Sequence, residues 1–174
     1  MSTNQTSVNN ITIHVGLAGN TADFVTRISV AKKSITIKNM LDDLGDDDGS
    51  EDNSVPITNI TPEIFKKVLE YCEYIHDNPG TAEHVLEWTE DYTWKKKLDT
   101  WFLEYLNVPE EITVGVTNAA NFLDIPSLLK MQCKYIGSLI KDKTPDELSV
   151  FFGKDKPIAA AAASSSAASE AAAQ

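Results

Sequence analysis

The sequence is short of basic residues. It has 15 lysines and arginines against 26 aspartates and glutamates, so its 174 residues carry a formal net charge of −11. A nucleic-acid-binding surface needs a basic stripe that neutralises phosphates and releases counterions. Because the charge has the opposite sign, we expect neither nucleic acid nor an anionic membrane surface to be a partner. Acidity can also simply aid solubility, which is the plainer explanation for it.

Cysteine and long apolar runs are scarce as well. The two cysteines, Cys72 and Cys133, each lie in an apolar helical pattern with no closely spaced Cys or His beside them. A disulfide framework would need more cysteines, so we expect both to be small buried hydrophobes in a reducing compartment. The polar residues 1–10 do not resemble a secretory signal, and no apolar run approaches the roughly 20 residues that span a bilayer. These features favour a cytoplasmic or nuclear protein, or one found in both places.

Catalytic and cofactor motifs are also missing. There is no Gly-x-Ser-x-Gly elbow, phosphate-binding loop or dinucleotide-binding turn, and no clustered acid, base and nucleophile. The three histidines are scattered: His14, His76 and His84. The sequence therefore predicts a protein that is not an enzyme and that binds no cofactor.

An acidic run at residues 42–54 is the one candidate metal site. A calcium loop of the EF-hand type places oxygen ligands at alternate positions and a glycine sixth. If Gly49 were that glycine, Leu44 would occupy the first ligand position, so the pattern fails. A flexible, solvated acidic loop is favoured, and we expect no metal site.

Apolar periodicity in the first half predicts a small sheet with helices. Residues 11–15 alternate apolar and polar and predict a strand, and 22–28 predict a second strand that completes a hairpin. Helical spacing follows from Val30 to Leu44, and 55–57 predict a short strand in which Pro56 indicates a sheet edge.

The second half reads as a series of helices. Thr61-Pro62-Glu63 predicts a helix start, followed by an apolar stripe that ends by Pro79. Residues 80–97 mix aromatic, basic and acidic residues, which favours a surface insertion with a partly packed tryptophan over a nucleic-acid patch. Further helices are expected at about 98–106, 110–123 and 126–141. Thr144 and Glu147 form a capping box that starts a short last helix.

The helix expected at 126–141 is apolar around an unusually wide arc. At about 100° per residue, two apolar lines form roughly 135° apart. One contains Leu129, Cys133, Ile136 and Ile140, and the other contains Leu128, Met131, Tyr135 and Leu139. A helix resting on one core needs a stripe of only about 100°. Either this helix packs on two sides within its own domain, or one line faces the core and the other faces a partner protein.

Several strings, taken in order, resemble the S-phase-kinase-associated protein one family, the adaptors of cullin–F-box ubiquitin ligases. They include Ser29–Gly45, with its Lys-Lys-Ser-Ile-Thr-Ile-Lys core, and Val55-Pro-Ile57. Further strings are Phe65–Cys72, Asp77-Asn-Pro79, Ala119–Ile125, Leu128-Leu129, Cys133-Lys134 and Ile140–Leu148. The similarity runs from about residue 11 to 153, except for the insertion at 80–97.

The resemblance implies a POZ/BTB-like α/β domain, a small sheet with helices, followed by a carboxy-terminal helical partner-binding region. It implies a disordered 1–10, a POZ-like domain over 11–106 and a helical dimerisation and F-box-binding region over 107–153. Asn121 and Phe122 match the family's Asn-Tyr pair near its cullin contact, with one hydroxyl lost. The F-box-facing positions are Val114, Thr117, Leu129, Cys133, Ile136 and Ile140.

Two departures from the family pattern leave an alternative open. Thr113, Thr117 and Asn118 stand where the family has apolar residues, and a low-complexity Ala/Ser tail at 154–174 replaces the family's closing acidic helix. The leading expectation is an adaptor that binds F-box proteins and a cullin. The alternative is a structural or self-assembling paralogue that has lost one of these partners and whose free apolar line pairs with a second copy.

Overall fold

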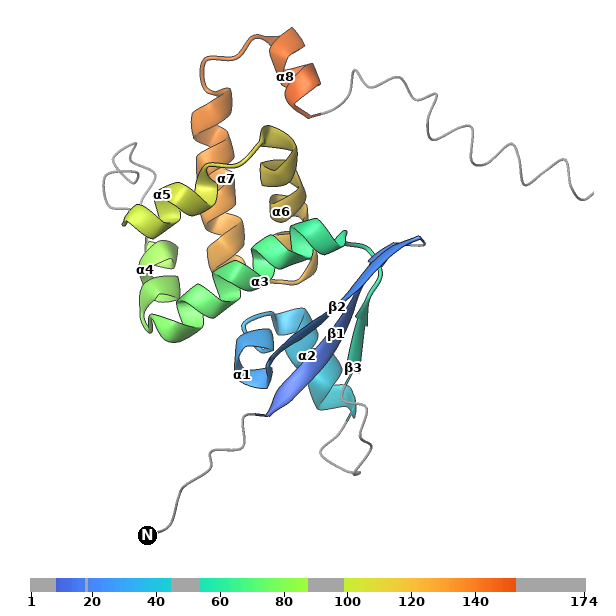
Figure 1. The fold of residues 1–174 in the computed structure, drawn as a ribbon. Coiled ribbons are helices and arrows are strands. Elements are labelled where there is room, and N and C mark those ends of the chain that lie inside the picture. The colour runs from blue at the N-terminus through green and yellow to red at the C-terminus, as the bar shows by residue number, and fades with distance from the viewer. Residues whose placement is uncertain (1–8, 18, 45–53, 88–98, 153–174) are drawn as a thin grey trace, which may run out of the picture. The chain divides into compact units, whose positions relative to one another are not determined.

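The computed structural model describes residues 9–17, 19–44, 54–87 and 99–152 (Figure 1). Its elements are β1 (Asn10–Leu17), β2 (Asn20–Arg27), α1 (Ile28–Ala31), α2 (Ile35–Leu44), β3 (Ser54–Ile57), α3 (Pro62–Asp77), α4 (Thr81–Glu87), α5 (Thr100–Leu106), α6 (Glu110–Phe122), α7 (Pro126–Ile140) and α8 (Pro145–Phe151). The α/β class, with a small sheet followed by helices, is confirmed.

The chain divides into two compact units, residues 1–137 and 138–174. The domain limits inferred from the sequence, at 106/107 and 153/154, divide the chain by expected function and stay predictions. The acidic loop expected at 42–54 was wrong at its ends, because residues 42–44 belong to α2 and Ser54 begins β3. Residues 45–53, the second part of the insertion and the Ala/Ser tail lie outside the described residues.

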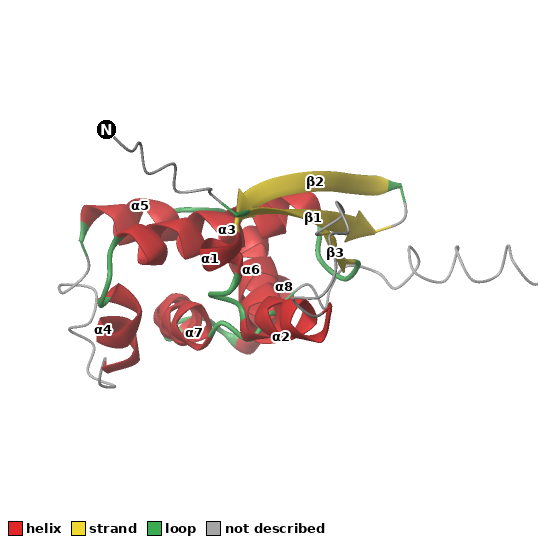
Figure 2. Ribbon diagram, turned by 90° about the horizontal axis from the view of Figure 1, so that it is seen from below, coloured by secondary structure: helices red, strands yellow, loops and turns green. Residues whose placement is uncertain are grey.

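The sheet has three strands in the order β2-β1-β3 (Figure 2). β1 pairs antiparallel with β2, with Ile13 opposite Phe24, and parallel with β3, with Ile13 opposite Val55. Along β1 the apolar side chains of Ile11, Ile13 and Val15 are at most 1% exposed, while His14 between them is exposed. The apolar side chains of β1 thus lie on one face of the sheet, and helices cover that face. All three predicted strands are confirmed, and Pro56 lies on an edge strand of the described sheet.

The turn of the β1–β2 hairpin depends on glycine. Gly16 has a φ of 143°, and a Cβ there would lie 2.1 Å from the carbonyl oxygen of Asn20. A side chain would therefore collide with the returning strand.

The prediction of one helical stretch from Val30 to Leu44 was wrong in one respect. Two helices occupy it, α1 and α2, with a turn at residues 32–34 between them. The Ser34 hydroxyl accepts a hydrogen bond from the Ile37 backbone N–H at 3.1 Å, which caps the new helix. Apolar spacing continued across the break because Val30, Ala31 and Ile37 all enter the same core.

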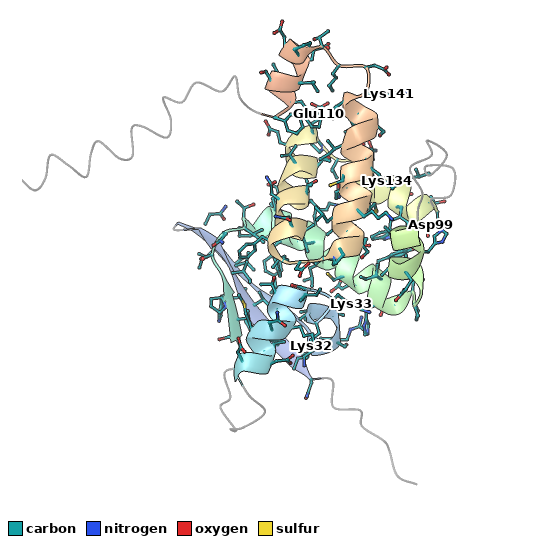
Figure 3. The ribbon with its side chains drawn as sticks, turned by 180° about the vertical axis from the view of Figure 1, so that it is seen from behind. Lys32, Lys33, Asp99, Glu110, Lys134 and Lys141 are labelled. Atoms are coloured by element: carbon teal, nitrogen blue, oxygen red, sulfur yellow. The ribbon has the colours of Figure 1, made fainter. Side chains whose placement is uncertain are left out.

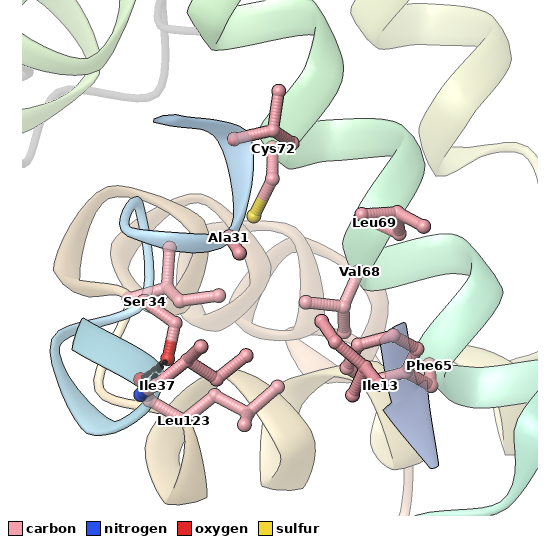
Figure 4. A pocket seen from close by; sticks show the side chains of 11 residues that line it. Ile13, Ala31, Ser34, Ile37, Phe65, Val68, Leu69, Cys72 and Leu123 are labelled. Atoms are coloured by element: carbon pink, nitrogen blue, oxygen red, sulfur yellow. Dashed lines mark hydrogen bonds between the residues drawn. The ribbon is translucent and has the colours of Figure 1, made fainter. Parts of the chain in front are cut away.

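The core lies between the covered face of the sheet and helices α1, α2 and α3, and α6 packs on α3. A cavity of about 10 Å³ remains in it, lined by side chains that include Ile13, Phe65, Cys72 and Leu123 (Figure 4). Because a single water needs about 10–15 Å³, this is an ordinary packing gap and not a ligand site.

Aromatic stacking joins α3 to α5. The Tyr74 and Trp101 rings stack at 3.7 Å between centroids, and Trp101 also stacks on Tyr105 at 5.0 Å. The Tyr74 hydroxyl donates to the Asp99 carboxylate at 2.5 Å, and this bond is the main cause that raises the tyrosine pKa to about 12. Asp99 also caps α5 by accepting from the Phe102 N–H at 3.1 Å.

Helix α3 begins as predicted, with Thr61 as its N-cap, although the Thr61 side chain makes no capping bond. The expectation of a surface insertion at 80–97 was wrong for its first part. Residues 81–87 form α4, and its Val85 is 0% exposed. The tryptophans of the insertion, Trp88 and Trp94, lie outside the described residues.

In the second unit, α8 begins with the predicted capping box. The Thr144 hydroxyl accepts from the Glu147 N–H, and the Glu147 carboxylate accepts from the Thr144 N–H at 2.7 Å. The Thr144 N–H and the Thr144 hydroxyl, which donates to the same carboxylate at 2.8 Å, lower the pKa of Glu147, because both bonds stabilise its charged form. No helix in the described part of the chain is both long enough and apolar enough to cross a membrane.

Candidate protein-interaction surface

One side of α7 anchors the helix in the core. We call Leu128, Met131, Tyr135 and Leu139 the core line. Leu128 and Met131 are 0% exposed, and Tyr135 packs against the core cluster, where burial raises the pKa of its hydroxyl. Leu139 is half-buried. The core line is therefore the apolar stripe through which α7 packs on the core.

The opposite apolar side is not enclosed. We call Leu129, Cys133, Ile136 and Ile140 the outer line. Cys133 is exposed, and the other three are half-buried. Only Leu129 of the four packs against the core cluster. The described chain therefore leaves part of this apolar line open to solvent.

The two cysteines differ from the sequence expectation that both are buried. Cys72 is buried as predicted, and burial raises the pKa of its thiol to about 12, so it is no nucleophile at neutral pH. For Cys133 the prediction was wrong. Cys133 does lie among apolar residues of a helix, but these residues form the outer line and not the core.

Lysines border the outer line. By helical period Lys130 and Lys134 lie next to it, and Lys141 directly follows the end of α7 (Figure 3). An apolar strip with a basic margin suits a partner helix that is apolar on one face and acidic at the edge of that face.

Helix α6 runs beside α7 in Figures 1 and 2 and carries the other two predicted F-box positions. Val114 and Thr117 are both half-buried. The Thr117 hydroxyl donates to the Thr113 carbonyl at 2.8 Å, so its polarity is satisfied within the helix. Thr113 itself is 0% exposed and takes part in the interior of the unit. Of the two threonine departures from the family, only Thr117 changes the surface.

The predicted cullin-contact residues lie at the end of α6. Asn121 and Phe122 are both exposed, and the Phe122 ring is a large apolar group that solvent reaches to 37%. They share no residue with the outer line of α7. Val114 and Thr117 lie on the same helix, and Asn121 follows Thr117 by four residues, so the two predicted partner surfaces adjoin on α6.

A groove of about 350 Å³ adjoins Phe122, and sequence reasoning did not find it. It is lined by Asn59, Ile60, Thr61, Ile64, Gly115, Asn118, Ala119 and Phe122. At one of these lining positions, Gly115 permits the close approach of Ile64, because a Cβ there would lie 2.6 Å from Cδ1 of Ile64. The available signal was a glycine inside a helical pattern, which often marks close packing.

No group of three or more His, Cys, Asp or Glu side chains able to hold a metal ion occurs within the described ranges. What the described geometry offers is surface for protein contacts: an apolar line with a basic margin, and a groove beside an exposed aromatic ring.

Known proteins are similar in sequence to this chain over most of its length. A family model described as "Skp1 family, tetramerisation domain" matches residues 21–77, which cover β2 to α3. The "E3 ubiquitin ligase complex SCF subunit sconC" of Arthroderma benhamiae is 37% identical over 124 residues, which are 71% of this chain and 71% of that protein. The protein of the same name from Arthroderma otae is 36% identical with the same coverage. These matches, together with the sheet and helices described above, show that the chain belongs to the Skp1 family.

Proposed function

We propose that the chain is a non-catalytic adaptor that links a cullin scaffold to F-box substrate receptors in an SCF-type E3 ubiquitin ligase, in the cytoplasm or nucleus. Family membership and the relatives' description as SCF subunits support this role. The single observation that carries it is the outer line of α7, an apolar strip that the described chain leaves partly uncovered.

The outer line has the chemistry to bind a helix. Burying a Leu or Ile side chain completely stabilises a complex by about 1.5–3 kcal/mol. Three aliphatic side chains and one thiol along one strip therefore offer substantial binding energy to a partner that covers them. An amphipathic helix fits such a strip, with its apolar face on the line and its acids towards Lys130 and Lys134.

The surface for the cullin lies at Asn121 and Phe122, with the adjoining groove as a receptor for an apolar side chain. An adaptor must hold two partners at once, and the two proposed surfaces have no residue in common. Phe122 lacks the hydroxyl of the family's tyrosine, and Asn118 places an amide in the groove. Relative to the family, these differences remove one hydroxyl and add one amide at the surface proposed for the cullin.

Self-assembly is a second candidate function. The same uncovered outer line and the exposed Phe122 are apolar, and the matching family model is described as a tetramerisation domain. Light scattering across a dilution series separates the two functions. A chain that stays monomeric throughout the series would count against self-assembly.

Co-purification from native extract, with mass spectrometry, tests the adaptor role. We expect the wild-type chain to recover F-box proteins and a cullin. Cys133→Asp should lose the F-box proteins, because a charge that is solvated in the free chain becomes buried in the complex. Cys133→Ser is the matched control, since it keeps the size of the side chain without a charge. Recovery of neither partner by the wild-type chain would reject the adaptor role.

A further inference from the structure

Hydrogen bonds tie the first turn of α2 to the last turn of α6. The Thr36 hydroxyl donates to the Phe122 carbonyl at 2.9 Å, and the Ser34 hydroxyl donates to the Leu123 carbonyl at 2.5 Å (Figure 4). The backbone N–H groups of Ile35 and Thr36 add bonds to the carbonyls of Asp124 and Leu123, at 3.2 and 3.3 Å. The two helices thus meet end to end.

These hydrogen bonds pair backbone carbonyl and N–H groups that the ends of helices normally leave unpaired. The last carbonyls of α6 and the first N–H groups of α2 have no partner within their own helices. The chain turns away directly after the junction, where Asp124 has a φ of 50°. The exposed pair Asn121 and Phe122 stands immediately before that turn, so the direction of both side chains depends on how the last turn of α6 is held.

We propose that Thr36 is a positioning residue for the surface formed by Asn121 and Phe122. Its hydroxyl holds the carbonyl of Phe122 and so fixes the direction in which that ring faces the cullin. The inference rests on the proposed function, because it assigns a partner to this surface.

Thr36 is better suited to this role than Ser34. Ser34 is 1% exposed and also caps α2, so replacing it disturbs the core and the helix start together. Thr36 is half-buried, and its hydroxyl bond to Phe122 is separate from its backbone bond to Leu123. Removing the hydroxyl alone therefore changes only the hold on Phe122.

Thr36→Val removes the hydroxyl and keeps the shape. We expect it to weaken binding of a purified cullin roughly three- to ten-fold, the range for one lost hydrogen bond. The affinity for a purified F-box protein should not change, and Thr36→Ser should restore cullin binding. Thr81→Val is the matched control, because the Thr81 hydroxyl also donates to a carbonyl, that of Asn78 at 2.7 Å, at the junction of α3 and α4.

A measurement on the free chain distinguishes the positioning role of Thr36 from the proposed adaptor function. The ring resonances of Phe122 in the free chain should shift in Thr36→Val and not in Thr81→Val. Unchanged ring resonances, or wild-type cullin affinity in Thr36→Val, would overturn the positioning role. If wild-type chain fails to bind any cullin while the resonances shift as expected, the proposed function fails and Thr36 positions the ring for another partner. Equal losses of cullin and F-box affinity would show a general structural defect and also contradict the proposal.

Discussion

The two sides of α7 are made of similar residues and have different surroundings. The core line contains Leu128 and Met131, which are wholly buried, while the outer line contains Cys133, which is exposed, and Ile136, which is half-buried. Composition therefore does not distinguish the two sides, and only the fold does. The core line packs in the interior, and the outer line is the surface that we propose for a partner.

The comparison separates stability from binding within one helix. A residue on the core line contributes to the free energy of unfolding of the isolated chain. Under the proposed function, a residue on the outer line contributes mainly to the free energy of a complex, because the partner completes its burial. Paired substitutions on the two sides can break or support this division.

The largest effect is expected on stability from the core line. Leu128→Ala should lower the free energy of unfolding by about 2–5 kcal/mol, because it leaves a cavity in a close-packed core. Ile136→Ala on the outer line should lower it by less than about 1 kcal/mol. Urea denaturation followed by circular dichroism measures both. Equal losses in the two variants would show that the outer line belongs to the core.

A smaller effect is expected on F-box binding from the outer line. Ile136→Ala should weaken binding to a purified F-box protein by about 1–2 kcal/mol, because the partner completes the burial of a side chain that is half-buried in the free chain. Isothermal titration calorimetry gives the value. Val25→Ala is the control, since Val25 is 66% exposed on β2 and lies outside both proposed surfaces. Loss of affinity in the control and not in Ile136→Ala would place the interface elsewhere.

The smallest effect is expected at the end of α6. Phe122→Tyr adds the hydroxyl found in the family and should strengthen cullin binding by about 0.5–1.5 kcal/mol, the net value of one hydrogen bond. The Phe122 ring is already exposed, so the added group does not disturb the core. F-box affinity should stay the same. Binding by surface plasmon resonance tests both partners, and weaker cullin binding would indicate a groove matched to phenylalanine.

Sequence periodicity was sufficient for most elements and failed where two elements share one core. The strands, α3 and the capping box of α8 follow from alternation, capping residues and spacing. The break before Ser34 was hidden, because Val30 and Ile37 on either side of it face the same interior. Helix α4 was missed for a related reason, since it contacts the core through Val85 and the small residue Ala82 within a mixed polar segment.

The surfaces were only partly accessible to sequence reasoning. Helical period identified both lines of α7 but could not decide which of them is enclosed, because the answer depends on neighbours that are distant in sequence. The same limit applies to Cys133, which an apolar pattern wrongly placed inside. The groove beside Phe122 is lined by residues from two parts of the chain that are far apart in sequence, such as Ile64 and Gly115. The functional roles of the predicted site residues stay predictions.

The most direct test of the account is the rate at which iodoacetamide alkylates Cys133, measured by mass spectrometry with and without a saturating F-box protein. Cys72 is buried with a raised pKa and serves as the internal reference that should stay unmodified. The account predicts that Cys133 reacts in the free chain and is protected in the complex. An equal rate of Cys133 alkylation in the free chain and in the saturated complex would contradict the account, because the partner would then not cover the outer line.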